Sequence, residues 1–97
     1  MAKAKPVFRQ KDVYPDGALI EMRVWAVPRS PRTPEGLKYS LVYIDPEGRR
    51  ALGYDNAEGK GHHRHEGRKE TVVSFLTIEG LIEQFSDEVE DIRRKRP

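Results

Sequence analysis

The sequence contains no cysteine, and this absence excludes a disulfide scaffold, a cysteine-based zinc finger and a cysteine nucleophile. It has no apolar run near the roughly 20 residues that a membrane-spanning helix needs, and no apolar segment follows its basic N-terminal residues as in a signal peptide. The motifs GxGxxG, GxxxxGK[ST], HExxH and GxSxG are missing, so dinucleotide-binding, P-loop, zincin and serine-hydrolase classes have no support. We therefore expect a small cytoplasmic protein.

The length and composition of the chain are sufficient for one domain. The chain has 97 residues, of which 36% are hydrophobic and 35% are charged, and this length suits a single small core. We expect residues 1–97 to form that single domain.

The charge is unevenly distributed, although the formal net charge is only +2. Residues 77–92 contain acidic side chains and no lysine or arginine, so the remainder of the chain is strongly basic. A basic body with one acidic element favours binding of a polyanion on one face. A charged surface is also what solubility alone requires in a small domain, and the charge pattern is compatible with both.

Hydrophobic patterns predict an α+β fold, in which a small antiparallel sheet of about four strands packs against one C-terminal amphipathic helix. The sheet is expected within residues 17–76 and the helix at 77–95, after a loosely ordered arm at 1–16. A glycine-containing, histidine-rich loop is expected at 55–68. The four strands are predicted at residues 18–27, 37–44, 49–54 and 71–75, with a turn at 45–48 that has proline second and glycine fourth.

The helix prediction depends on one apolar stripe at helical spacing, made of Ile78, Leu81, Ile82, Phe85, Val89 and Ile92. Thr77 precedes the stripe and is expected to cap the first turn. Packing the stripe on the apolar face of the sheet would bury both patterns at once.

All three histidines fall within four residues, as His62, His63 and His65. Histidine gives or takes a proton near neutral pH, and basic side chains neutralise charge that develops on a phosphorane. The segment therefore suits RNA cleavage without a metal, in which one imidazole deprotonates the 2′-hydroxyl and another protonates the leaving 5′-oxygen. The residues expected to hold phosphate or RNA are Lys60, Arg64 and Arg68 in this segment, with Arg23 and Lys38 in the sheet.

The histidines are also compatible with a metal site or with a surface loop that has no chemistry. His63 and His65 would place both rings on one side of an extended segment, where Asp55 or Glu66 adds an oxygen ligand for a metal. The spacing matches no strong zinc signature. A polar loop on the surface would account for the three histidines without any ligand.

Further candidate residues lie in the predicted strands. Asp55 follows the third strand, where its carboxylate would orient an imidazole with help from Tyr54 and Asn56; the alternative is a plain turn. Arg23 alternates with Trp25 on the less apolar face of the first strand and would form a basic platform with one stacking ring. The alternative for Trp25 is a place in the core.

Four parts of the sequence form a combined pattern: Lys38-Tyr39-Ser40-Leu41-Val42-Tyr43, Gly53-Tyr54-Asp55-Asn56-Ala57, Gly61-His62-His63-Arg64-His65 and the acidic C-terminal helix. Together they resemble the TumE-type toxins of bacterial and archaeal toxin–antitoxin modules. The resemblance covers roughly residues 18–92, and its most specific part is a Tyr-Asp-Asn element followed by a histidine-rich loop. It implies a growth-inhibiting toxin that a helix-turn-helix antitoxin neutralises, and it assigns no catalytic role to any residue.

The combined prediction is a toxin-like, metal-independent endoribonuclease that uses no cofactor. His63 and His65 are its expected proton-transfer groups, and His62 is the reserve candidate. The expected partners are RNA and an antitoxin, and we expect the antitoxin or a second copy in a homodimer to cover an exposed sheet edge. The alternative is a non-catalytic module that binds RNA or another protein.

Overall fold

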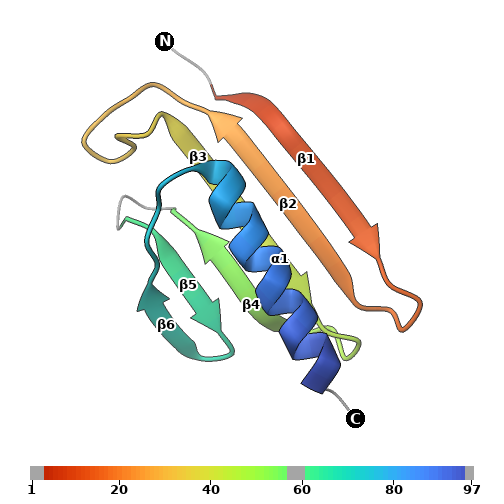
Figure 1. Cartoon of the computed structure of the whole chain (residues 1–97). Coiled ribbons are helices and arrows are strands. Elements are labelled where there is room, and N and C mark those ends of the chain that lie inside the picture. The colour runs from red at the N-terminus through yellow and green to blue at the C-terminus, as the bar shows by residue number, and fades with distance from the viewer. Residues whose placement is uncertain (1–3, 57–60, 96–97) are drawn as a thin grey trace.

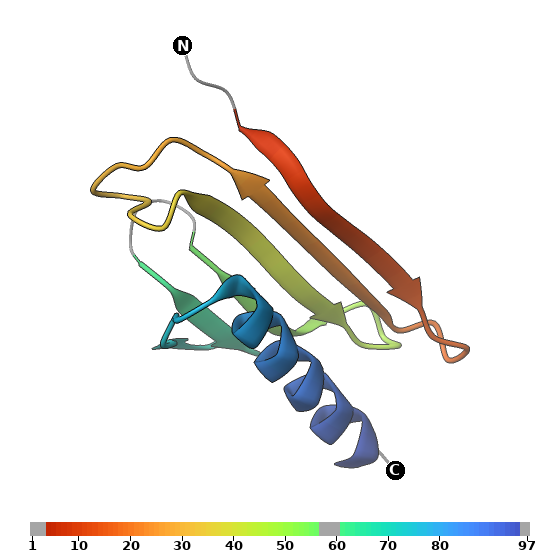
Figure 2. The ribbon, with the colours of Figure 1, turned by 45° about the horizontal axis from the view of Figure 1, so that its top comes forward.

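A computed structural model of the chain describes residues 4–56 and 61–95. Its six strands form one antiparallel sheet whose spatial order follows the chain, β1-β2-β3-β4-β5-β6, and the helix α1 crosses one face of that sheet (Figures 1 and 2). This arrangement confirms the expected α+β architecture with one C-terminal helix. The elements are β1 (Lys5–Val13), β2 (Leu19–Ala26), β3 (Leu37–Ile44), β4 (Arg50–Asp55), β5 (His63–Glu66), β6 (Lys69–Val72) and α1 (Ile78–Lys95).

The expected number of strands was wrong, because the sheet has six strands and not four. The two additional strands are β1, in the segment expected to be an arm, and β5, in the segment expected to be a loop. All nine residues of β1 are exposed, and β5 contains no apolar side chain. Neither strand buries a hydrophobic face, so neither shows the alternation from which a strand is recognised in a sequence. Both are held by backbone pairing with their neighbours.

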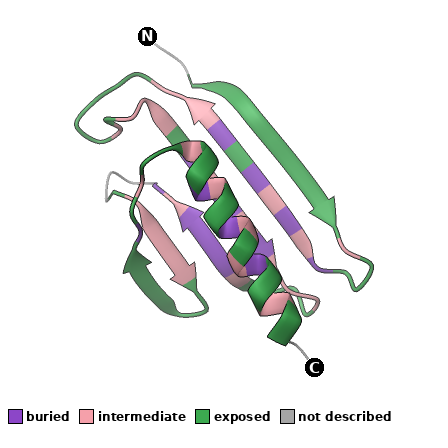
Figure 3. Ribbon diagram, viewed as in Figure 1, coloured by how far each residue is buried: buried purple, intermediate pink, exposed green. Residues whose placement is uncertain are grey.

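The core lies between the middle of the sheet and α1. Alternate residues of β2 and β3 point toward the helix and are buried, and the banding of β2 is visible in Figure 3. In β4, Leu52 and Tyr54 lie beside the inward residues of β3 and are buried with them. The helix contributes Leu81, Phe85 and Val89, and the Phe85 ring meets the Tyr54 ring edge to face, with their centroids 5.5 Å apart. Two apolar patterns of different period therefore bury each other, as the sequence predicts.

Both ends of α1 are fastened. At the start, the backbone N–H of Gly80 donates to the Thr77 hydroxyl at 3.0 Å, which confirms the predicted cap. Near the end, the Arg93 guanidinium donates to the Tyr43 hydroxyl at 3.0 Å and to Asp16 at 3.1 Å. It also lies 3.6 Å above the centre of the Tyr14 ring. Arg93 thus ties the helix to β3 and to the turn between β1 and β2.

The sheet face opposite α1, which we call the open face, is covered by no other element of the described chain (Figure 2). Strand register places one row of side chains across it, in which Arg9, Arg23, Ser40, Asp55 and His63 are successive partners from β1 to β5. A second row runs beside it and consists of Lys11, Glu21, Val42, Gly53, His65 and Glu70. The open face is polar, and both rows reach the histidines of β5.

Candidate functional site

The three histidines do not form one cluster. Side chains of a strand alternate between the two faces of a sheet, so His63 and His65 of β5 share the open face, whereas Arg64 between them points toward α1. His62 precedes the strand and contacts Tyr39 on the side of the sheet that α1 covers. Backbone alternation therefore divides the histidine-rich segment into a pair on one face and a separate ring on the other.

Each histidine of the pair lies beside a carboxylate from a neighbouring strand. The Nε2 atom of His65 is 3.3 Å from Asp55 of β4, and the Nδ1 atom of His63 is 3.0 Å from Glu70 of β6. Both rings are largely covered, with 19% and 16% of their side chains exposed. A carboxylate at this distance can orient the imidazole ring that faces it.

The spacing of the pair suits two-centre proton transfer. Residues two apart in a strand stand about 6.6 Å apart along the chain, so His63 and His65 present two imidazoles on one face with room for a phosphodiester between them. Asp55 stands next to His65, in the position that its proposed orienting role requires. Sequence analysis did not identify Glu70 as a candidate site residue. The signal for it is the two-residue connection Gly67-Arg68, which is typical of a β-hairpin and brings residue 70 opposite residue 65.

His62 belongs to an aromatic and hydrogen-bonded cluster that joins distant segments. Its ring is parallel to the Phe75 ring at a centroid separation of 4.5 Å. Its Nδ1 atom is 2.7 Å from the Tyr39 hydroxyl, and its Nε2 atom is 2.9 Å from Glu35. Glu35 lies in the proline-rich loop between β2 and β3, residues 27–36. An ionised carboxylate can only accept a hydrogen bond. The Nε2 atom of His62 therefore carries a hydrogen and donates this hydrogen bond to Glu35.

The charges of this cluster fit that pattern. Burial, reinforced by the nearby carboxylates Asp55 and Glu35, raises the pKa of the Tyr39 hydroxyl, which therefore keeps its proton as a donor. The hydrogen bond from His62 lowers the pKa of Glu35, which stays ionised. Tyr39 is only 1% exposed, and both ring nitrogens of His62 are occupied by Tyr39 and Glu35. These contacts give His62 a structural role in joining the loop to the sheet.

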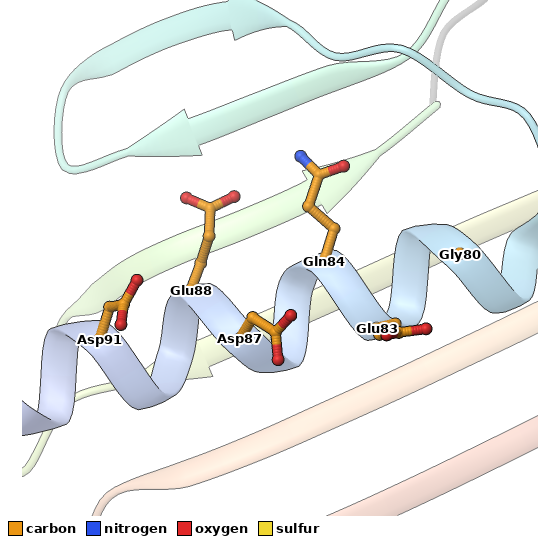
Figure 4. A pocket seen from close by; sticks show the side chains of 6 residues that line it. All are labelled: Gly80, Glu83, Gln84, Asp87, Glu88 and Asp91. Carbon is orange, nitrogen blue, oxygen red and sulfur yellow. The ribbon is translucent and has the colours of Figure 1, made fainter.

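The Arg64 side chain forms an ion pair with Glu88 of α1. Its Nε and Nη2 atoms donate to the Glu88 carboxylate, with Nε 2.9 Å from Oε2, and Nη2 also lies 3.2 Å from Glu66. Figure 4 shows Glu88 and Gln84 pointing from α1 toward the strands β4 and β5. Arg64 therefore lies on the other side of the sheet from the histidine pair and fastens α1 to β5.

The residues flanking Asp55 also have structural positions. Tyr54 is fully buried against Phe85, and its hydroxyl accepts a hydrogen bond from Gln84 at 3.2 Å. The buried Asn56 side chain accepts from the Tyr39 N–H at 3.0 Å and donates to the Leu37 carbonyl at 2.8 Å. It thereby closes the end of β4 against β3. Neither side chain stands on the open face.

The remaining basic candidates have mixed positions. Arg23 and Lys38 are exposed on the open face, where Trp25 pairs with Lys38 across β2 and β3. Arg23 donates to Glu21 at 2.8 Å and lowers the pKa of that carboxyl. Arg68 is exposed in the turn between β5 and β6. Lys60 lies outside the described residues.

Residues 4–56 and 61–95 contain no group of three histidine or acidic side chains close enough together to hold a metal ion. In the same ranges, α1 is too polar to be a membrane-spanning helix, and no other helix is present.

Comparison with known proteins identifies the family. The model of a family described as Toxin TumE matches residues 3–93, a range that includes all six strands and most of α1. No curated protein and no solved structure matches the chain. A toxin family implies an antitoxin as partner. The resemblance seen in the sequence is therefore confirmed, and the chain belongs to the TumE toxin family.

Proposed function

We propose that this protein is the toxin of a cytoplasmic toxin–antitoxin module and that it cleaves RNA on the open face of its sheet without a metal. The observation that carries the proposal is the pair of imidazoles on β5, each within 3.3 Å of a carboxylate on a neighbouring strand. Attack of a ribose 2′-hydroxyl on the adjacent phosphorus requires paired acid–base groups of this kind.

The chemistry needs two proton transfers. One imidazole of the pair accepts the proton of the 2′-hydroxyl, whose oxygen then attacks the adjacent phosphorus. The other, as an imidazolium, donates a proton to the departing 5′-oxygen, so that a 2′,3′-cyclic phosphate and a free 5′-hydroxyl result. Asp55 and Glu70 orient the two rings.

The charge distribution supports a polyanionic substrate on this face and a different partner on the other. Arg9, Lys11, Arg23 and Lys38 lie on the open face, while the acidic residues of α1 lie across the molecule (Figure 4). RNA on the open face would thus avoid the acidic helix. We propose that a helix-turn-helix antitoxin, or a second copy of the chain, covers a sheet edge such as the exposed strand β6.

The test is cleavage of labelled single-stranded RNA in EDTA across a range of pH. We expect a bell-shaped rate profile and products that end in a cyclic phosphate. His63→Ala and His65→Ala should each lower the rate by about 10²- to 10⁴-fold, as loss of a general acid or base does. Binding without cleavage at any pH would instead favour the non-catalytic RNA-binding module, and activity that EDTA removes and zinc restores would favour a metal site.

A matched control is available in the third histidine. His62→Phe removes an imidazole from the same short segment but keeps a flat ring beside Tyr39 and Phe75. Assayed below its melting temperature, this variant should cleave RNA at a rate close to the wild type. An equal loss of activity in all three variants would contradict the assignment of the pair.

A further inference from the structure

A shallow hollow lies at the β1 end of the open face, away from the histidines. It has a volume of about 240 Å³ and is lined by Pro6, Phe8, Arg9, Arg23 and Trp25. Small-molecule pockets usually enclose roughly 300–1,000 Å³, so this hollow suits one unit of a longer ligand.

Two arginines of the hollow stand directly opposite each other. Arg9 of β1 is the register partner of Arg23 of β2, and like charges at such positions destabilise a sheet. Glu21 neutralises part of this charge, because Arg23 donates to it at 2.8 Å. A guanidinium has five N–H donors, so the ion pair with Glu21 leaves other donors of Arg23 available. The exposed Arg9 side chain adds its own donors, and together they can bind a second anion. A phosphate between the two guanidiniums would relieve the repulsion.

The aromatic side chain beside them supplies a second kind of contact. Trp25 is only partly buried and pairs across the strands with Pro6 on one side and with Lys38 on the other. An indole that lines a hollow with two arginines offers a stacking surface next to an anion site. Stacking of a base on an aromatic ring is worth about 1–3 kcal/mol and requires an unpaired base.

From this juxtaposition we infer that the hollow binds one nucleotide of single-stranded RNA, with its phosphate between Arg9 and Arg23 and its base on Trp25. The inference rests on the proposed function for the identity of the polymer. Arg23 and His63 occupy the same row across the open face and are separated by three strand spacings, or about 14 Å. The bound nucleotide is therefore a few positions away from the bond that is cut, and the RNA crosses the strands of the sheet.

Trp25 is the only tryptophan of the chain, so its fluorescence reports on the hollow directly. We suggest titrating the protein with a fully 2′-O-methylated oligouridylate, which carries phosphates and bases but lacks the hydroxyl needed for cleavage. Saturable quenching is expected, and its affinity should fall as salt rises. Arg9→Gln and Arg23→Gln should each weaken binding and reduce the slope of log affinity against log salt by about one.

The loss of stacking is measured with a labelled oligonucleotide, since Trp25→Ala removes the reporter. Fluorescence anisotropy should show binding about 5- to 150-fold weaker for this variant, which corresponds to the loss of one stacked base. Lys69→Gln is the matched control, because it removes one positive charge from β6 at the far edge of the sheet and should leave affinity close to wild type. Circular dichroism establishes that each variant keeps its sheet.

The outcomes separate this inference from the proposed function. Quenching that depends on Arg9 and Arg23 in a protein that cuts no RNA would support the nucleotide site and refute the nuclease. Cleavage that depends on His63 and His65, with no quenching and no effect of the two arginine variants, would overturn the site and leave the nuclease standing. An equal effect of Lys69→Gln would also overturn the site, because binding would then depend on overall charge alone.

Discussion

The contact between Arg64 and Glu88 allows a direct test of where Arg64 acts. The sequence places this arginine among the phosphate ligands, whereas the structure places its guanidinium against a carboxylate of α1. The two side chains are 22% and 23% exposed. Exposed ion pairs contribute roughly 0.2–1 kcal/mol, and breaking a fully buried pair costs about 3–5 kcal/mol. For this half-buried pair, we expect Arg64→Met to lower the free energy of unfolding by an intermediate amount, about 1–3 kcal/mol.

The measurement is a double-mutant cycle in which urea unfolding is monitored by Trp25 fluorescence. Arg64→Met and Glu88→Gln should each destabilise the protein, and the double variant should lose less than the sum of the two. In a domain of this size, each kcal/mol corresponds to roughly 4–8 °C in melting temperature. Arg64→Met should bind RNA nearly as well as the wild type. A variant with unchanged stability and strongly reduced RNA binding would refute the structural role of Arg64.

Substitutions at three other residues test the core, the end of β4 and the His62 cluster. Phe85→Ala should cost about 3–5 kcal/mol in urea unfolding, because it empties a fully buried ring site against Tyr54; a loss below about 1 kcal/mol would contradict the packing. Asn56→Ala should cost about 1–3 kcal/mol, because it leaves the Tyr39 N–H and the Leu37 carbonyl unpaired. Asn56→Asp should lose at least as much, because it sets a carboxylate oxygen against the Leu37 carbonyl in a buried site. Glu35→Gln should be less stable than the wild type at neutral pH. The stability advantage of the wild type should be complete above 4.5, the ordinary pKa of a glutamate, and should disappear as pH falls through the lowered pKa of Glu35. The reason is that a lowered pKa means that folding stabilises the ionised carboxylate. A stability difference that stays constant down to about pH 3 would contradict the His62–Glu35 contact.

The middle of the sheet and the helix were predictable because each buries one apolar face. Tyr39, Leu41 and Tyr43 alternate inward along β3. The predicted turn after this strand is confirmed by the hydrogen bond from the Gly48 N–H to the Asp45 carbonyl at 2.9 Å. Strands β1 and β5 were not predictable in this way, because they are held by backbone pairing and bury no apolar face. Such pairing leaves no hydrophobic period in the sequence.

The same difficulty affected the candidate site. Proximity of three histidines along the chain predicts one cluster, but a strand sends His63 and His65 to one face and Arg64 to the other. The spacing of His63 and His65 already predicts that both rings share one side of an extended segment, and recognition of β5 as a strand would have added that Arg64 faces the other side. The partners of His62 were not accessible to local analysis, because Glu35 precedes it by 27 residues and is brought near only by the folded proline-rich loop.

The order of elements along the chain has a consequence for synthesis of the protein. Every strand pairs with its immediate neighbour in sequence, so the sheet can assemble progressively while the chain leaves the ribosome. The helix follows all six strands, and the apolar side chains of β2, β3 and β4 stay in contact with water until it has emerged. A nascent chain that stops before Ile78 would expose this surface permanently, which makes it a target for chaperones and proteases.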